Sequence, residues 1–511
     1  MVILSQLPQP ILHHILSLLP QKDAVQTSVL SKSWRYLWHG RLNVEFRDNC
    51  FARKNESWSF LDNTLQRYLD QNLSLQKFLV DIDHFDVDLV LLQKWVPMAI
   101  MNMGVKSLTL IFRCNTRGKN FSLPLVVFQS ESLVELNLQW HNLYTLRSTD
   151  YVMLNNLRTL RLFGVYITDE VFEKILSGCP LIENLDLFMC TGMKSIKLPK
   201  LCNIKNFSCT SLYEIIIEIE NPQTLESVRI RNNYRDWFLH HRNTHFTHLK
   251  SLKLYTVRLP EKFDNFLSFF PCINELILDS CFVLKEFRIS SSSIKRLTVK
   301  MDLINPEKRI KVFIDTPNIL YFEYSGHVFL PSFKFMATSN EWKSHISVSY
   351  ELKPSDNEAT SWFLELNKLL KALSQSRITL NLNPKEYEKL HINDSLGGFY
   401  NPVVVEQLKL PGCFSFSSDP TILNCLFRIC RPRYIHTDQF VNELVEFICN
   451  LIPEKVGCYF WLQDLEELRI EVWDMKAGKW NCVQRTSLPA LPSKQPIRFR
   501  LTWREQLSKL T

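Results

Sequence analysis

One spacing recurs along the middle of this 511-residue chain and restricts what it can fold into. The spacing is L-x-x-L-x-L, with the apolar residue type varying, and successive copies begin roughly 21 to 25 residues apart. Alternate apolar side chains suit one buried face of a short strand. Such a unit cannot bury that face alone, so the copies must stack. Copies begin at Leu133, Leu157, Ile182, Ile204, Leu225, Leu249, Ile273, Ile294 and Ile319, and Val105 starts a degenerate earlier copy.

A period in the low twenties with this spacing is the signature of leucine-rich repeats. We therefore predict an α/β fold in which each repeat adds a strand to a solenoid, an αβ horseshoe. The stretch NLRTLRLFGVYITDEVFEKILSGCPLIENLDLFMC reads strand, helix, strand. Thr168 caps the expected helix and Gly178 ends it. The side chains expected to face the core from this helix are Val171, Phe172, Ile175 and Leu176.

The first forty residues carry a different pattern, three short helices rich in apolar residues. Pro10 suits the first turn of a helix, and Pro20 ends it. Lys22 opens a second helix, and Ser31 is a good N-cap for a third that carries Trp34. Helices this short cannot bury so many apolar side chains among themselves. Part of their surface must therefore meet another molecule or the rest of this chain.

The segment LPQPILHHILSLLPQKDAVQTSVLSKSWRYLW resembles the F-box of the plant F-box/leucine-rich-repeat protein family. The segment LSGCPLIENLDL resembles the repeats of the same family. The acidic residue often found before the first Leu-Pro of the family is absent, since Leu4, Ser5 and Gln6 stand there. The residues that match the family pattern are Leu7, Pro8, Ile15, Leu16, Leu19, Pro20, Ala24, Val25, Leu30, Ser31, Trp34, Leu37 and Trp38.

The resemblance implies that the N-terminal helices bind a small Skp-type adaptor and, through it, a cullin. The protein would then be the substrate-recognition subunit of an SCF-type (Skp–cullin–F-box) ubiquitin ligase, not itself an enzyme. The alternative is an F-box-containing repeat scaffold or small-molecule sensor that binds partners without directing degradation. The implied adaptor-binding residues are Leu7, Pro8, Ile11, Ile15, Leu16, Leu19, Pro20, Val25, Leu30, Ser31, Trp34, Leu37 and Trp38.

The side chains between the apolar positions of each repeat strand are expected to point into solvent and to hold an unknown protein target. Glu275 and Asp279 lie between the basic positions, and mixed charges suit a protein better than a nucleic-acid backbone. For any one residue, an ordinary solvated strand position is the alternative. The expected target-binding residues are Arg161, Arg229, Arg231, Lys253, Tyr255, Arg296 and Lys300.

These patterns divide the chain into an F-box over residues 1–45, a linker and helical cap over 46–104, repeats over 105–335, and diverged repeats or a C-terminal α/β cap over 336–511. An amphipathic helix is expected over 58–72, and a second over DLVLLQKWVPMAIMNMGV, kinked or started by Pro97. Beyond residue 330, VEQLKL at 405 and LEELRI at 465 fit the repeat template singly.

Other classes of function find no support in the sequence. Neither GxGxxG nor GxxxxGK[ST] occurs, no CxxC pair suggests zinc, and the net charge of +8 is spread along the chain. We expect no metal at His241 and His245, no calcium loop in DIDHFDVD, whose acids suit a strand edge, and no cofactor. We expect no nucleic-acid partner and no membrane contact. The absence of a signal-peptide pattern favours a cytoplasmic and/or nuclear protein.

Overall fold

A computed structural model describes residues 7–19, 21–27, 29, 34–35, 37, 40–47, 54–82, 89–113, 123–143, 146–147, 149–198, 203–219, 222–235, 237–240, 245–282, 286–301, 310–326, 332–336, 342–350, 356–384, 402–410, 421–437, 460–484 and 496–504. Two compact units divide the chain, Met1–Leu249 and Lys250–Thr511.

The first unit begins with short helices. Helix α1 spans Gln9–Leu18 and helix α2 spans Gln21–Thr27, and Trp34 is also helical. Pro10 lies in the first turn of α1, where a missing backbone N–H costs nothing. Leu19 leaves the helix in an extended conformation before residue 20. The predicted all-α N-terminal segment is confirmed.

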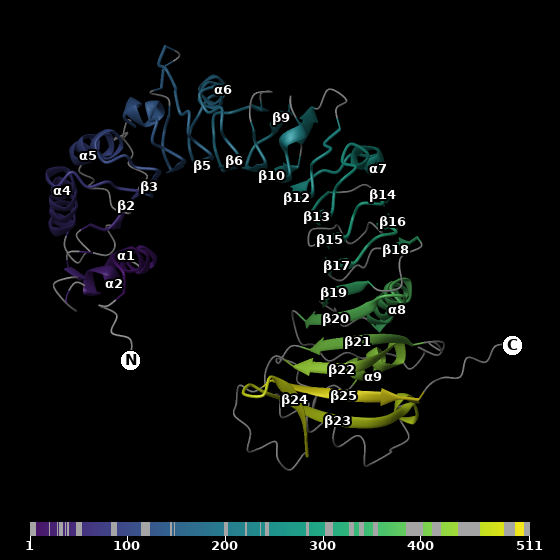
Figure 1. Cartoon of the computed structure of the whole chain (residues 1–511). Helices are drawn as coiled ribbons and strands as arrows, with labels where there is room; N and C mark the ends of the chain where they lie inside the picture. Colours follow the sequence, from purple (N-terminus) through teal and green to yellow (C-terminus); the bar gives the residue numbers. More distant parts are fainter. Residues whose placement is uncertain are drawn as a thin grey trace. The chain divides into compact units, whose positions relative to one another are not determined.

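The main sheet of the first unit is parallel and follows the repeats in chain order (Figure 1). Every repeat-starting residue from Val105 to Leu225 is buried, which confirms the solenoid. Its strands are β1 Asn43–Arg47, β2 Lys77–Ile82, β3 Ser107–Phe112, β4 Glu135–Gln139, β5 Thr159–Phe163, β6 Asn184–Phe188, β8 Asn206–Ser211 and β10 Ser227–Arg235.

An outer layer covers one face of this sheet (Figure 1). Its helices are α4 Lys54–Asp70, α5 Leu89–Met101, η3 Leu125–Gln129, α6 Asp169–Ser177 and η4 Pro222–Thr224. A small parallel sheet of β7 Ser195–Leu198, β9 Ile215–Ile219 and β11 Trp237–His240 also belongs to this unit, and α6 packs on β7. Helix α5 runs through Pro97, so this proline does not start it. The Thr168 hydroxyl accepts a hydrogen bond from the Val171 amide, and Gly178 follows the last turn of α6, as the sequence predicts.

The strands of three successive repeats are each followed directly by a residue with positive φ. Trp140, Gly164 and Met189 have φ of 62°, 60° and 52°. Each donates its backbone N–H to the last or next-to-last strand residue of the following repeat, at 2.7 Å in all three cases. The left-handed residue therefore turns the chain out of the sheet and still completes the ladder of hydrogen bonds.

The second unit continues the same architecture and confirms the α/β fold class. Its parallel strands are β12 Ser251–Val257, β13 Glu275–Asp279, β15 Arg296–Met301, β17 Tyr321–Gly326, β19 Lys343–Tyr350, β20 Arg377–Pro384, β21 Val403–Leu410 and β22 Cys430–Thr437. The remaining elements alongside them are α7 Phe263–Leu267, β14 Glu286–Ser290, β16 Lys311–Asp315, β18 Ser332–Phe335, α8 Asp356–Ala372 and α9 Thr421–Ile429.

Antiparallel strands close the far end of the second unit. Strand β25, Ile497–Trp503, pairs antiparallel with β22 and with β23, Leu465–Asp474, which in turn pairs with β24, Lys479–Val483. The short helix η5, Phe460–Gln463, precedes them. The template match at residue 465 is therefore an antiparallel strand, whereas the match at 405 lies on β21, which is parallel to both neighbours.

Candidate functional site

The described part of the N-terminal helices forms an apolar core cluster of its own. Leu12, Leu16, Ala24, Trp34 and Leu37 form a buried cluster, and Leu7, Ile15 and Leu19 pack against it. Three expected adaptor-binding residues, Leu16, Trp34 and Leu37, thus lie inside this N-terminal module rather than on its surface. Pro20, Leu30, Ser31 and Trp38 lie outside the described residues, as does the side chain of Val25.

A second set of apolar side chains, on α1 and in the turn after α2, faces solvent. Ile11 is 47%, Leu18 71% and Val29 82% exposed. Ile11, Ile15 and Leu18 share one face of α1, because residues four and seven apart align on a helix. Pro8 is exposed beside them. Leu18 and Val29 were missing from the expected adaptor-binding set, although the helical phase of Ile11 and Ile15 already pointed to Leu18. We call Ile11, Leu18 and Val29 the exposed apolar surface.

A buried arginine joins the N-terminal module to the repeats. Arg41 is 3% exposed, and its Nη2 donates to the Leu19 carbonyl at 2.5 Å, beyond the end of α1. The Tyr68 hydroxyl of α4 donates to the Arg41 backbone carbonyl. Burial lowers the pKa of Arg41, partly opposed by Glu45, and burial raises the pKa of Tyr68 to about 12. Tyr68 is therefore a neutral donor at neutral pH.

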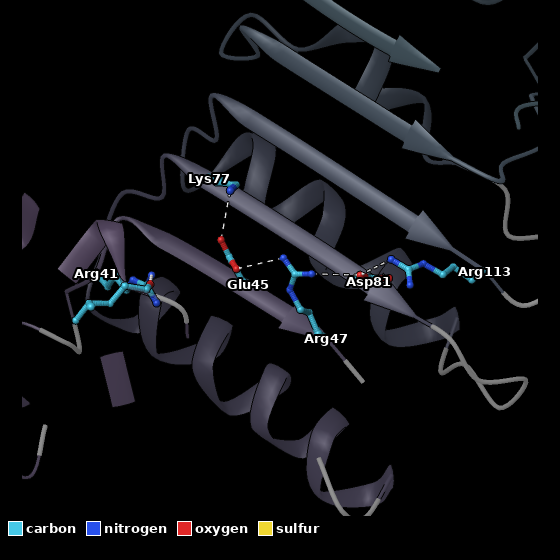
Figure 2. Close-up of polar contacts among 7 residues, drawn as sticks. Arg41, Glu45, Arg47, Lys77, Asp81 and Arg113 are labelled. Atoms are coloured by element: carbon cyan, nitrogen blue, oxygen red, sulfur yellow. Dashed lines mark hydrogen bonds and ion pairs between the residues drawn. The ribbon is translucent and has the colours of Figure 1, made fainter. Parts of the chain in front are cut away.

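A ladder of ion pairs crosses the first strands beside this junction (Figure 2). Glu45 pairs with Lys77 at 3.3 Å and with Arg47 at 3.6 Å. Asp81 pairs with Arg47 at 3.5 Å and with Arg113 at 3.2 Å. Asp81 is 3% exposed, so it is a buried strand acid rather than one at a solvated edge. Residues 83–88 of the same acidic stretch lie outside the described residues.

The expected target-binding residues of the first unit are exposed on the face of the sheet that carries this ladder. Arg161 on β5 and Arg229 and Arg231 on β10 are all exposed. Arg161 lies opposite Asp186 on β6 but makes no ion pair with any described residue. Thr159 lies between apolar positions of its repeat strand, which predicts a side chain in solvent, yet it is buried, and its hydroxyl accepts a hydrogen bond from the Asn184 amide of the next strand at 3.2 Å.

The expected target-binding residues of the second unit are largely matched to neighbouring strands. Lys253 pairs with Glu275 at 2.9 Å, and Lys300 pairs with Glu323 at 3.7 Å. The Arg296 guanidinium lies 4.8 Å from the centre of the Tyr321 ring. Tyr255 is half-buried. These charges therefore already stabilise one another across the sheet, unlike that of Arg161.

Metal and nucleophile chemistry has no geometric support in the described part of the chain. Among those residues no group of His, Cys, Asp and Glu could hold a metal, and no helix is long and apolar enough to cross a membrane. His245 is exposed, and His241 lies outside the described residues. Burial raises the pKa of the Cys190 thiol to about 11 and that of Cys209 to about 12, so both are protonated at neutral pH.

Comparison with known protein families decides the classification. The F-box domain family matches residues 4–44, and the family described as "At1g61320/AtMIF1, LRR domain" matches residues 70–238. The chain therefore combines an F-box domain with a leucine-rich-repeat domain. These matches cover the N-terminal module and most of the first unit's sheet.

Curated proteins that are similar to this chain come from Arabidopsis thaliana. The chain is 34% identical over 228 residues to F-box/LRR-repeat protein At3g59200, covering 41% of this chain and 42% of that protein. It is 35% identical over 218 residues to F-box/LRR-repeat protein At4g14096, covering 39% and 43%. It is 27% identical over 226 residues to F-box/FBD/LRR-repeat protein At5g22700, covering 44% and 49%. The chain thus spans less than half the length of these relatives, and no enzyme family is indicated.

Proposed function

We propose that this F-box/LRR-repeat protein is the substrate-recognition subunit of an SCF-type ubiquitin ligase. F-box domains generally bind Skp-type adaptors, and leucine-rich repeats generally bind targets. The observation that carries the proposal is the exposed apolar surface of the N-terminal module. Ile11, Leu18 and Val29 remain in solvent although the described residues of the module already form a buried apolar cluster. Large exposed aliphatic side chains on such a small module mark a binding surface.

The protein's contribution would be proximity rather than bond chemistry. A target held on the repeats would be brought close to a charged ubiquitin-conjugating enzyme on the cullin, which raises the effective concentration of the target's lysines. The junction at Arg41 supports this role. It ties the C-terminal end of α1 to α4, and so links the adaptor-binding module to the repeats.

The test is adaptor binding by a variant that changes only exposed residues. We expect Ile11→Asp combined with Leu18→Asp to weaken co-purification of the full chain with a purified plant Skp-type adaptor by about tenfold or more. The reason is that charged groups would replace apolar side chains that the adaptor would bury in the complex. Val90→Asp is the matched control, since Val90 on α5 is 75% exposed and lies outside the module. If the double variant still bound the adaptor, the exposed apolar surface would not be the adaptor-binding surface.

Trp34 is a less informative position for this test. It is 4% exposed in the core of the module, so truncation would leave a cavity and unfold the adaptor-binding surface whether or not the indole touches a partner. A scaffold without degradation predicts a different cellular result. Its captured target would keep the same lifetime when the exposed apolar surface is changed, whereas a ligase target would accumulate.

A further inference from the structure

We propose that Trp140, Phe163 and Phe188 anchor an extended target segment that carries a large apolar side chain beside a carboxylate. We call these three residues the aromatic row. Trp140 directly follows β4, and Phe163 and Phe188 are the last residues of β5 and β6, all in the first unit. The inference rests on the proposed function, in which the repeats hold a protein target, and it names the part of the repeats that does so and the chemistry of what they hold.

The three rings form one continuous apolar surface across neighbouring strands. The rings of Phe163 and Phe188 are stacked, with centroids 4.4 Å apart and planes at 10°. The Trp140 indole meets Phe163 edge-on, at 5.1 Å between centroids. Since neighbouring strands lie about 4.8 Å apart, the row covers roughly the length of three residues of an extended peptide.

The row is accessible and held in place before any partner binds. Trp140 is 48% exposed, and Phe163 and Phe188 are partly exposed. The backbone of Gly164 fixes the indole, because a Cβ at that position would lie 2.3 Å from Trp140 Cε3. Rigid aromatic side chains lose little conformational entropy on binding and are enriched among the residues that dominate interface energy.

The positive charge of Arg161, next to the aromatic row, favours a bound segment that carries a carboxylate beside its apolar side chain. Arg161 precedes Phe163 by two residues on β5, so both side chains leave the same face of the sheet. It is exposed and has no ion-pair partner among the described residues, in contrast to Lys253 and Lys300. Asp186 lies on the β6 side of Arg161, and the uncharged Asn137 lies on the β4 side. A carboxylate reaching Arg161 from the β4 side avoids Asp186.

A protein segment fits this surface better than a nucleic acid does. Phe163 and Phe188 already cover part of each other's faces, which leaves less ring surface for stacked bases. Asp186 would repel a phosphate backbone that ran along the row, and a phosphate backbone needs several cationic contacts for affinity.

The experiment is selection of phage-displayed random peptides of about 12 residues on the immobilised full chain. We expect enrichment of peptides in which Phe, Trp, Leu or Met lies within about two residues of Asp or Glu. Trp140→Ala and Arg161→Glu should each weaken binding of the selected peptides by about tenfold. Because Arg161 is exposed and makes no ion pair with a described residue, Arg161→Glu tests the proposal even if Trp140→Ala destabilises the fold.

Matched controls lie in the same unit. Tyr151→Ala removes an aromatic side chain that is 66% exposed, and Arg147→Glu reverses an exposed charge. Both residues lie outside β4, β5 and β6. Both variants should bind the selected peptides as the wild type does. The proposal would be overturned if no peptides were selected, or if the selected peptides did not pair a large apolar residue with Asp or Glu. It would also be overturned if Arg161→Glu bound the selected peptides as well as the wild type does. Binding of labelled oligouridine that is lost in Trp140→Ala would overturn it too.

Adaptor binding, measured on the same preparations, separates this inference from the proposed function. Trp140 and Arg161 lie outside α1 and α2, so their variants should bind the adaptor normally. A wild type that binds the adaptor but selects no peptides rejects only the aromatic row. A wild type that binds the selected peptides but no adaptor rejects only the ligase.

Discussion

At the residue scale, Gly164 shows how one position serves both fold and surface. Its φ of 60° disfavours any side chain, and a Cβ would collide with Trp140. We expect Gly164→Ala to cost about 1–2 kcal/mol for the left-handed conformation and about 1–3 kcal/mol more for the clash. Gly104→Ala is the control, because φ is 64° there and no atom lies within 4 Å of the added carbon. The measurement is the rate of hydrogen exchange in β4 to β6, which we expect to rise more in Gly164→Ala than in Gly104→Ala. Equal increases in the two variants would contradict a clash with Trp140.

A second residue, His141, makes the first unit sensitive to pH. Its ring is buried against Phe112, and its Nε2–H donates to the Leu110 carbonyl at 3.2 Å. Burial lowers its pKa from 6.5 to about 4, although the hydrogen bond to Leu110 favours the charged ring. The unfolded chain therefore binds the extra proton first, and this contribution to stability is complete above about pH 6.5 and lost as pH falls toward about 4.

The measurement is the melting temperature of the wild type and of His141→Gln, a polar variant that does not titrate, at about pH 7 and about pH 5. We expect the melting temperature of the wild type to fall further on acidification than that of His141→Gln. Identical losses would mean that His141 does not control the response.

The sequence predicts residue positions well where one periodicity decides them. Val105 and Leu133 are buried, as the repeat spacing requires. The aromatic row was missed because Trp140 occupies a variable position of the pattern, and its contact with Phe163 depends on the register between strands. The pattern places Thr159 in solvent for the same reason, since only the neighbouring strand shows that Asn184 donates to its hydroxyl.

At the element scale, the link between helix α1 and the repeats depends on Arg41. We expect Arg41→Met to remove the bond to the Leu19 carbonyl and to cost about 1–3 kcal/mol, since a buried acceptor loses a charged donor. Hydrogen exchange should speed up in α1 and α4 and stay unchanged in β4 to β6. Arg47→Met is the control. Arg47 pairs with Glu45 and with the buried Asp81, which keeps its pair with Arg113 (Figure 2), so the loss of Arg47 should act on β1 and β2 and leave hydrogen exchange in α1 unchanged. If hydrogen exchange in α1 sped up equally in Arg41→Met and Arg47→Met, another contact would hold α1 to the repeats.

Element types were predictable, but their connections were not. Phe60, Leu65 and Tyr68 gave helix α4 its amphipathic pattern, yet no local pattern shows that Tyr68 would meet the Arg41 carbonyl. The match at 465 to the repeat template likewise fits a strand. Its antiparallel pairing depends on β25, which lies far along the chain.

At the scale of the whole molecule, the proposed adaptor-binding and target-binding surfaces lie on different elements, so the two proposed activities should be separable in a reconstituted ligase reaction. We expect Ile11→Asp with Leu18→Asp to abolish ubiquitin transfer both to a fused acceptor carrying a selected peptide and to this chain itself, because the adaptor is lost. Arg161→Glu should reduce only transfer to the peptide acceptor, since the assembled ligase still modifies its own subunits. Arg147→Glu should change neither. Loss of both activities in Arg161→Glu, with adaptor binding intact, would mean that the repeats influence the ligase beyond holding its target, and proximity alone would no longer explain the protein's action.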